Sequence, residues 1–506
     1  MKFIRYPKSL LPKIQNLLQP LLALWSWMMT LGTSLLMLLA NLASGMVAAH
    51  VLEPTGRGIL AAAILWPSLL ASLLVFGLND AVLYFIAGRR LSTKRVWRST
   101  LLMSLVLTAI GVVLAWLLLP ALVYQGHPDI LAASKFGVML IPPMLIGTIF
   151  VEFLRARGRL WLWNLARMLN AILYPILLVV FYWQGLSTPR WFVLAFALSQ
   201  VPTALLALWG GIIGEAAPDR GRHKRHNLPT TSAPEILPLR LSLRSHASLG
   251  MLWRDGKAIV RYGWRNHLSA MVNVVAQRID QMLVALWLAP GDLGLWVVAI
   301  SLSSVAGVVS NSLALLIWPR LAAAQTKERI VILGLALRAT LCLTAAACVV
   351  IAVASPWVLG WFFGQGFVAA APVVMILCLS MIPIAGRDLL CLAFKAADRS
   401  LYLFQSESIN LFVMIVVFAL FVPVGGLIGA ALAMLVVRCV SLGYLLILLQ
   451  RKLSMPIRSL FFPQPFDPSL SMQADAVTPL MKKPPQGWLH RRMAEGRYLL
   501  TSSPLE

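Results

Sequence analysis

Long runs of apolar residues recur along most of this chain and constrain its fold more than any other feature. Hydrophobic residues make up 59% of the 506 positions, charged residues make up 12%, and the mean hydropathy is +0.82. A soluble protein could not bury so much apolar surface. Runs of about 20 residues are long enough to cross a bilayer as helices, and they are continuous rather than alternating. The sequence therefore predicts an all-α polytopic membrane protein.

About twelve transmembrane spans fit this pattern, six in each half of the chain. The predicted spans are 25–51, 59–87, 99–120, 131–152, 162–184, 191–213, 262–289, 294–318, 331–355, 368–391, 403–423 and 427–450. Five regions follow from them: an N-terminal cytoplasmic segment (1–24), a six-helix lobe (25–214), a basic cytoplasmic linker (215–260), a second six-helix lobe (261–450) and a Pro-rich, largely disordered cytoplasmic tail (451–506).

The net charge of +25 reflects membrane topology rather than nucleic-acid binding. Lys and Arg cluster in alternate loops and in the tails, whereas the intervening loops are short and poor in both. Positive loops face the cytoplasm, so both termini are predicted to be cytoplasmic, in the cell inner membrane. The five cysteines form no Cys-x-x-Cys pair, and no metal or cofactor site is expected.

A weak internal repeat relates the two halves. At an offset of 236, the segment 25–84 matches 261–320, and this places Pro54 on Pro290 and Gly58 on Gly294. A second stretch matches at an offset of 240 and places Asn170 on Asn410. Two related bundles predict a transporter, because a site between them can open to either side when one rocks against the other.

Polar residues inside the spans are candidates for a functional site, since ionisable groups are costly in lipid and usually face a cavity or a partner. Gln277, Arg278 and Asp280 lie inside the seventh span, and Asn41 overlays Gln277 at the offset of 236. These residues either form a polar cavity wall, or Arg278 and Asp280 form an ion pair that fixes helix packing.

Two further charged residues lie within spans. Asp80, near the inner half of span two, could carry a proton or pair with Arg89 or Arg90. Arg438 lies well inside the last span without an acidic neighbour in sequence, so its partner is expected on another helix or on a ligand.

Several short segments resemble the polysaccharide repeat-unit flippases (Wzx-type) of the multidrug/oligosaccharidyl-lipid/polysaccharide exporter superfamily. The segment 51–58 resembles their turn after the first span, and 77–85 resembles their second span. Residues 158–167 resemble the opening of their fifth span, and 261–321 is the best match. Glu53, Asp80, the basic insert and the Pro-rich tail depart from the family pattern, which leaves the substrate and the coupling ion open.

The resemblance implies a MATE-like fold with a central cavity lined by spans one, two, seven and eight. It also implies movement of an undecaprenyl-pyrophosphate-linked oligosaccharide from the inner to the outer leaflet, for surface polysaccharides such as O-antigen lipopolysaccharide or exopolysaccharide. In that reading Arg278 binds the pyrophosphate, while Asp280 orients it or joins Asp80 as an ion-coupling candidate. The implied partners are the lipid-linked oligosaccharide, membrane lipids, and the glycosyltransferases and polymerase of the same pathway.

Three other functions are alternatives for such a chain. A cation-coupled multidrug exporter of the same fold should prefer acidic cavity residues, whereas here the candidates include Arg278. A lipid II flippase usually has two further spans, and the sequence after 451 has no apolar run to supply them. A membrane glycosyltransferase, polymerase or ligase tends to carry catalytic groups in a large external loop. The predicted external loops are short, so the sequence favours a protein that is not an enzyme.

Overall fold

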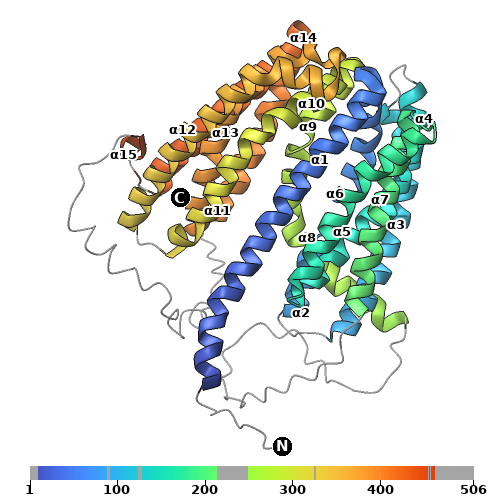
Figure 1. Ribbon diagram of the computed structural model, residues 1–506. Helices are drawn as coiled ribbons and strands as arrows, with labels where there is room; N and C mark the ends of the chain where they lie inside the picture. The colour runs from blue at the N-terminus through green and yellow to red at the C-terminus, as the bar shows by residue number, and fades with distance from the viewer. Residues whose placement is uncertain are drawn as a thin grey trace, which may run out of the picture. The chain divides into compact units, whose positions relative to one another are not determined.

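The fold is described from a computed structural model of the chain (Figure 1). The structure describes residues 10–87, 92–123, 128–212, 249–323, 326–397, 399–453, 455 and 457–461. The chain divides into two compact units, Met29–Phe462 and a smaller one made of Met1–Met28 and Pro463–Glu506. The described part of the smaller unit is the beginning of the first helix, from Leu10. Everything below concerns the larger unit.

The described residues of the N-terminal half are almost entirely helical. The elements are α1 (Leu10–Leu73), α2 (Leu78–Ala87), α3 (Thr93–Val123), α4 (Pro128–Gly137), the 3₁₀ turn η1 (Val138–Leu140), α5 (Ile141–Ala156), α6 (Leu160–Trp183) and α7 (Pro189–Ile212).

The described residues of the C-terminal half follow the same plan. The elements are α8 (Leu249–Ala276), α9 (Ile279–Trp287), α10 (Pro290–Ser303), the 3₁₀ turn η2 (Ser304–Ala306), α11 (Gly307–Ala323), α12 (Thr326–Val358), the π-helical turn η3 (Leu359–Phe363), the 3₁₀ segment η4 (Gln365–Ala370), α13 (Ala371–Ala396), α14 (Ser400–Leu453) and α15 (Ile457–Phe461).

The predicted all-α membrane fold is confirmed, and helical segments occupy all twelve predicted spans. Spans one and two share α1, which kinks at Glu53 (φ 56°) before Pro54, because proline lacks the N–H that a continuous helix needs. Spans eleven and twelve share α14, which kinks at Gly426 (φ 54°). Eight described helices are long and apolar enough to cross a membrane, and the two kinked ones each contain more than one predicted span.

Two spans are interrupted rather than merely bent. The second span breaks over residues 74–77, where Phe76 and Gly77 adopt positive φ values of 48° and 66°. The seventh span breaks between α8 and α9, where Arg278 adopts φ −126°. Broken helices place backbone groups and polar side chains at membrane depth, which is tolerated where they line a cavity.

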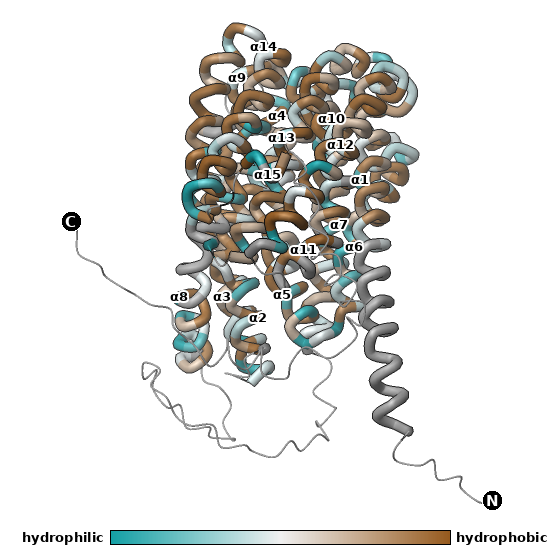
Figure 2. The backbone as a smooth tube through the Cα atoms, turned by 90° about the vertical axis from the view of Figure 1, so that its left-hand side faces the viewer, coloured by the Kyte–Doolittle hydropathy of each residue, from teal (hydrophilic) through white to brown (hydrophobic). Residues whose placement is uncertain are grey.

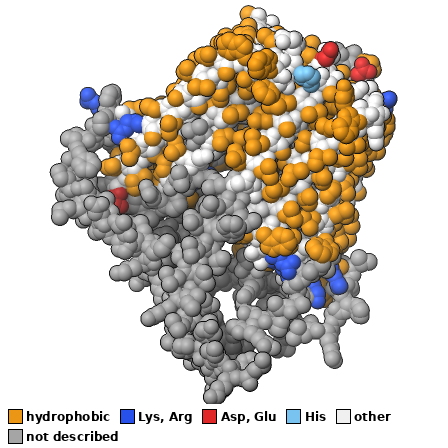
Figure 3. All heavy atoms as spheres, in the orientation of Figure 1, with side chains coloured by type: hydrophobic (Ala, Val, Ile, Leu, Met, Phe, Trp, Pro, Cys, Tyr) orange, Lys and Arg blue, Asp and Glu red, His pale blue; other side chains and the backbone are white. Residues whose placement is uncertain are grey.

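The apolar surface is that of a membrane protein. Large hydrophobic side chains face outward along the helices, among them Leu117 (69% exposed), Trp361 (79%) and Val424 (90%). Hydrophobic residues predominate along the helices in Figure 2, and apolar side chains cover most of the described surface in Figure 3. Buried cores lie within the N-terminal half and within the C-terminal half, and a further core combines C-terminal residues with Ala49 and Ala62 of α1. The outward apolar surface and the long apolar helices are those of a multi-pass membrane protein.

The two lobes meet through a reciprocal pair of glycines. A Cβ on Gly58 would lie 1.6 Å from the carbonyl oxygen of Pro290, and one on Gly294 would lie 2.0 Å from the carbonyl oxygen of Pro54. Gly58 thus packs on Pro290 of the other half, and Gly294 packs on Pro54. The two prolines correspond to each other at the offset of 236, and so do the two glycines. The sequence repeat is therefore a structural repeat, and corresponding turns face each other across the lobe boundary.

Helix α8 begins earlier than the sequence predicted and packs on the N-terminal lobe. It starts at Leu249, inside the stretch expected to be linker, and Arg95 of α3 forms a two-bond salt bridge with the buried carboxylate of Asp255. A Cβ on Gly263 of α8 would lie 2.6 Å from the carbonyl oxygen of Phe76. The last residues of the predicted linker, from Leu249, are therefore helical, and Asp255 among them has a partner on α3 that sequence alone does not reveal.

The boundary of the C-terminal tail also differs from the prediction. Helix α14 continues to Leu453, and the short helix α15 follows with Leu460 buried against α12. Leu460 shares a buried core with residues of α11, α12, α13 and α14. The rest of the predicted tail and most of the predicted linker, residues 213–248, lie outside the described residues.

Candidate functional site

A polar cavity of about 790 Å³ lies within the C-terminal lobe. Its walls come from α8 and α9, α10 and α11, α13 and α14. The polar lining residues are Asn273, Gln277, Asp280, Gln281, Asn311, Arg387, Asp388, Cys391, Lys395, Glu407, Asn410 and Arg438. Three carboxylates and three cations face this one space, beside five carboxamide side chains.

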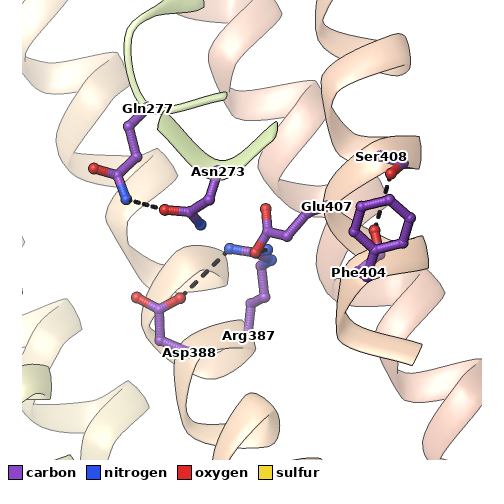
Figure 4. Close-up of polar contacts among 7 residues, drawn as sticks. All are labelled: Asn273, Gln277, Arg387, Asp388, Phe404, Glu407 and Ser408. Carbon is purple, nitrogen blue, oxygen red and sulfur yellow. Dashed lines mark hydrogen bonds and ion pairs between the residues drawn. The ribbon is translucent and has the colours of Figure 1, made fainter. Parts of the chain in front are cut away.

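An ion pair between α13 and α14 crosses the cavity wall (Figure 4). Arg387 is only 7% exposed, its Nη2 donates to Glu407 Oε1, and its Nη1 lies 3.6 Å from Asp388 Oδ1. Asp388 follows Arg387 directly in α13, and its side chain is half exposed to the cavity. Glu407, near the start of α14, turns inward toward Arg387, because a buried guanidinium requires a counter-charge.

Arg438 and Asp280 form a second polar cluster in the same cavity. Arg438 Nη1 donates to Ser380 Oγ of α13 at 2.7 Å, so its partner does lie on another helix. Asp280 is 5% exposed and accepts a hydrogen bond of 3.3 Å from the indole Nε1 of Trp296. The opposite charges of Arg438 and Asp280 also attract each other. These contacts fix the two side chains at the wall.

The break between α8 and α9 separates Arg278 from Asp280. Gln277 Nε2 donates to Asn273 Oδ1 at 2.6 Å, and both side chains line the cavity (Figure 4). Arg278 is exposed, its Nη1 lies 3.5 Å from Gln281 Oε1, and it is not among the residues that line this cavity. Residues two apart do not share a helix face. No ion pair joins Arg278 and Asp280 within the described residues, so the packing pair weighed from the sequence is not formed.

The other two predicted site residues lie elsewhere. Asn41 is exposed on α1, and its carbonyl oxygen accepts a hydrogen bond from Ser44. Asp80 is exposed in the first turn of α2, just after the break in span two. Neither residue lines a described cavity, and Arg89 and Arg90, the pairing partners weighed for Asp80, lie outside the described residues.

Sequence reasoning missed the Arg387–Asp388 pair, although the signal was present. Both residues lie inside the apolar run 368–391 and satisfy the same rule that singled out Arg278 and Asp280. The sequence singles out Asn410 only as part of the repeat. A search for charged residues within the predicted spans would have found Arg387. Its contact with Glu407 could not be predicted, because it depends on how α13 packs against α14.

A second cavity of about 420 Å³ lies in the N-terminal lobe, among α1, α5, α6 and α7. Its polar lining residues are Thr148, Glu152, Trp163, Arg167, Asn170, Gln200 and Thr203. Ser199 Oγ donates to Asn170 Oδ1 at 2.7 Å, and Thr203 Oγ1 donates to the carbonyl of Ala166 at 3.0 Å. The Arg167 guanidinium lies 4.5 Å from the centre of the Trp163 ring.

The two cavities occupy corresponding places in the repeat. At the offset of 240, Asn170 corresponds to Asn410, Arg167 to Glu407 and Thr148 to Asp388, and each of these residues lines its own cavity. Met37 of α1 and Asn273 of α8, related by 236, close the corresponding sides. The asparagines were matched from the sequence, and the structure brings both to equivalent polar spaces.

The lining groups suit a polar, oxygen-rich ligand. Carboxamides both donate and accept hydrogen bonds, arginine forks bind oxyanions, and carboxylates accept from hydroxyls. The larger cavity falls within the range of about 300–1,000 Å³ typical of small-molecule sites. No group of three or more metal-ligating side chains occurs among the described residues.

Comparison with known proteins gives one family match. A family model described as "Polysaccharide biosynthesis protein" matches residues 239–372, which span α8 to α12 and the start of α13. No curated protein sequence matches the chain. The matched segment contains the break in span seven and one wall of the larger cavity.

Solved structures match over most of the chain. The lipid II flippase MurJ in an inward closed conformation gives a TM-score of 0.65 at 13% identity, over 86% of this chain and 89% of that one. An inward-facing MATE family multidrug resistance transporter of the MOP superfamily also gives 0.65, at 16% identity, over 83% and 94%. A MOP superfamily transporter from Pyrococcus furiosus, whose binding pocket is described as having reverse polarity, gives 0.50 at 16% identity, over 85% and 94%. The MATE-like fold implied by the resemblance is thereby confirmed.

Proposed function

From its MOP-superfamily fold we propose that the chain is a flippase for an undecaprenyl-pyrophosphate-linked oligosaccharide repeat unit. It moves this lipid from the inner to the outer leaflet of the cytoplasmic membrane for surface polysaccharide synthesis. The lipid tail stays in the bilayer while the polar head group crosses through the protein. Both chain termini face the cytoplasm, and the glycosyltransferases and polymerase of the pathway act before and after it.

The observation that carries this proposal is the lining of the larger cavity. Five carboxamides, three carboxylates and three cations face a space of about 790 Å³ inside an apolar membrane protein. Sugar hydroxyls need many paired donors and acceptors, and a head group loses its water as it enters. The match of this segment to polysaccharide biosynthesis proteins supports the same substrate class.

Arg278 is assigned to the pyrophosphate. It lies at the break in span seven, exposed beside the cavity residue Gln277, and its side-chain contact with Gln281 at 3.5 Å leaves donors of the guanidinium available. A bidentate fork fits phosphate oxygens better than the point charge of lysine. Asp280, fixed at the cavity wall by Trp296, serves in orientation or ion coupling.

Two alternatives share the fold. The lipid II flippase and the multidrug transporter are both structural matches. Lipid II also carries a pyrophosphate and sugars, so it is the stronger rival. A cationic drug is less suited, because the cations of the larger cavity equal its carboxylates in number.

Depletion of the protein in its native cell tests the proposal. Lipid-linked oligosaccharide should then accumulate in the inner leaflet, where a lectin or periodate reaches it in inside-out vesicles but not in right-side-out ones. Accumulation of lipid II with normal oligosaccharide lipid would assign the chain to the rival function. Normal distribution of both lipids, with raised sensitivity to cationic drugs, would support the exporter.

A matched pair of variants ties the effect to the cavity. Asn410→Ala removes a carboxamide from the wall, whereas Ser312→Ala removes an exposed hydroxyl of α11 that donates to the carbonyl of Val308. Only the first variant should reproduce the accumulation, at equal protein levels in the membrane. Equal activity of the two variants would show that Asn410 and the cavity wall it belongs to are not needed for transport.

A further inference from the structure

We propose that the cavity of the N-terminal lobe is an oxyanion-binding subsite whose cation is Arg167. The ligand group is a phosphate or a sugar carboxylate of the carried head group. This inference rests on the proposed function for the identity of the carrier, but its binding chemistry is testable alone.

The first argument is a difference between corresponding positions of the repeat. In the C-terminal lobe, Arg387 and Glu407 neutralise each other across the cavity wall. At the offset of 240, Gly147 stands in place of Arg387, and Arg167 stands in place of Glu407. The N-terminal cavity therefore keeps a cation where its counterpart has a closed ion pair.

The second argument is that Arg167 forms no salt bridge with a carboxylate among the described residues, although the charge of Glu152 attracts it. Glu152 also lines the cavity, but its Oε2 pairs with Arg155 Nη1 at 3.3 Å. Arg167 is held instead by the face of Trp163, 4.5 Å from the ring centre. Stacking fixes the position of the guanidinium while leaving its N–H edge available for hydrogen bonds.

The third argument is the space and polarity around this cation. Gly147 contributes no side chain and therefore no charge to the wall, and a Cβ built there would lie in van der Waals contact, 3.8 Å from atoms of Ala204 and Thr203. Asn170, Gln200 and Thr203 supply neutral hydrogen-bonding groups around the same cavity. A cation, carboxamides and a hydroxyl together match an oxyanion attached to a hydroxylated group.

The fourth argument is location. Arg167 lies seven residues after Leu160, the first residue of α6, which places it about 10 Å along the helix at 1.5 Å per residue. The sequence predicts that this end of α6 faces the cytoplasm. An anionic head group that leaves the inner leaflet therefore meets this cation early on its path.

The test measures binding of radiolabelled pyrophosphate and of radiolabelled glucuronate to the full-length protein in nanodiscs. Arg167→Gln should weaken binding of at least one of them about tenfold or more, the loss expected when a charge-assisted contact disappears. Loss of pyrophosphate binding would identify a phosphate as the ligand group, and loss of glucuronate binding alone would identify a sugar carboxylate.

Two variants control for nonspecific effects. Arg190→Gln removes an exposed arginine that lies 5.7 Å from the Trp191 ring outside the cavity, and it should bind like the wild type. The double variant Gly147→Arg, Arg167→Glu rebuilds the ion pair of the other lobe; it should insert at normal levels and still fail to bind.

Several outcomes would overturn the inference. It fails if Arg167→Gln binds both probes as the wild type does, or if neither probe binds the wild type. It also fails if Arg438→Gln abolishes binding while Arg167→Gln does not, since the site would then lie in the other lobe. The proposed function is judged separately, by whether depletion strands the oligosaccharide lipid in the inner leaflet.

Discussion

The buried guanidinium of Arg387 shows how this fold accommodates charge at membrane depth. Glu407 and Asp388 lie on either side of it, and the first of these comes from the next helix. A cation left alone in this position would keep the desolvation cost without the Coulombic gain. The pair therefore joins α13 to α14 and shapes the cavity wall between them.

Removing one partner of this pair should destabilise the protein. Glu407→Gln leaves Arg387 buried with only Asp388 beside it, and breaking a buried pair costs about 3–5 kcal/mol. A thermal melt in detergent should show a clear loss. The swap Arg387→Glu, Glu407→Arg should recover most of it. Arg155→Ala, which breaks an exposed pair with Glu152, should cost less than about 1 kcal/mol. Equal melts for Glu407→Gln and Arg155→Ala would contradict this account.

Arg278 should behave as a ligand-binding residue rather than as half of an ion pair. Arg278→Lys keeps the charge but loses the bidentate fork, so surface polysaccharide should fall, and Arg278→Ala should lower it further. The swap Arg278→Asp, Asp280→Arg should stay defective at normal membrane levels, because the two side chains do not contact each other. Normal surface polysaccharide in the swap variant would contradict the proposed role of Arg278 in binding substrate.

At the scale of elements, the contact between the turns after spans one and seven depends on the absence of side chains. Gly58 and Gly294 let two backbones approach so closely that any Cβ would collide with a carbonyl oxygen. Gly58 lies in α1 of the N-terminal lobe, and Gly294 lies in α10 of the C-terminal lobe. The pair therefore forms a contact that must part if the lobes separate at this end.

A methyl group on either glycine should hold this end of the lobes apart. Cysteines placed at Thr55 and Gly291, where a Cβ on Gly291 lies 3.5 Å from Thr55 Oγ1, should crosslink readily in the otherwise wild-type protein. Gly294→Ala should cut the crosslinked fraction several-fold. Gly307→Ala, with no atom within 4 Å of the added Cβ, is the matched control. An unchanged yield with Gly294→Ala would show that the contact is not limiting.

The sequence predicted helices well because lipid leaves the backbone few choices. Length and hydropathy alone place the twelve spans, and the repeat places Pro54 and Pro290 at corresponding turns. Helix contacts were harder to predict. Asp255 finds Arg95 across the lobe boundary, and Glu407 finds Arg387 on α13, because tertiary packing decides which polar groups meet.

The candidate site was predicted in part for the same reason. Gln277, Asp280 and Arg438 do line one cavity. Each lies within an apolar run, where a polar side chain that faced lipid would be costly and therefore faces a cavity or a partner. Asn41 and Asp80 satisfied the same sequence rule but do not line either described cavity. Whether a polar residue faces a cavity depends on helix rotation, and the very apolar, weakly amphipathic helices here do not reveal that rotation from sequence.

For the molecule as a whole, the repeat and the charge pattern make a topological prediction. Reporter fusions after Arg225 and in the C-terminal tail should report the cytoplasm, and fusions near Asp129, Asp292 and Gly364 should report the outside. Positive loops at one face of both lobes give this orientation. Opposite signals at Arg225 and Asp129 would reverse the membrane orientation proposed here.

The central claim is that this fold moves an oligosaccharide attached to a lipid pyrophosphate across the bilayer, and reconstitution tests it most directly. Purified protein in proteoliposomes should expose lipid-linked oligosaccharide from the inner leaflet to an external lectin within minutes, while protein-free liposomes should not. Asn410→Ala should be slow and Ser312→Ala normal. The account predicts transport of this lipid in preference to lipid II; a rate no faster than protein-free liposomes, or equal transport of lipid II, would contradict it.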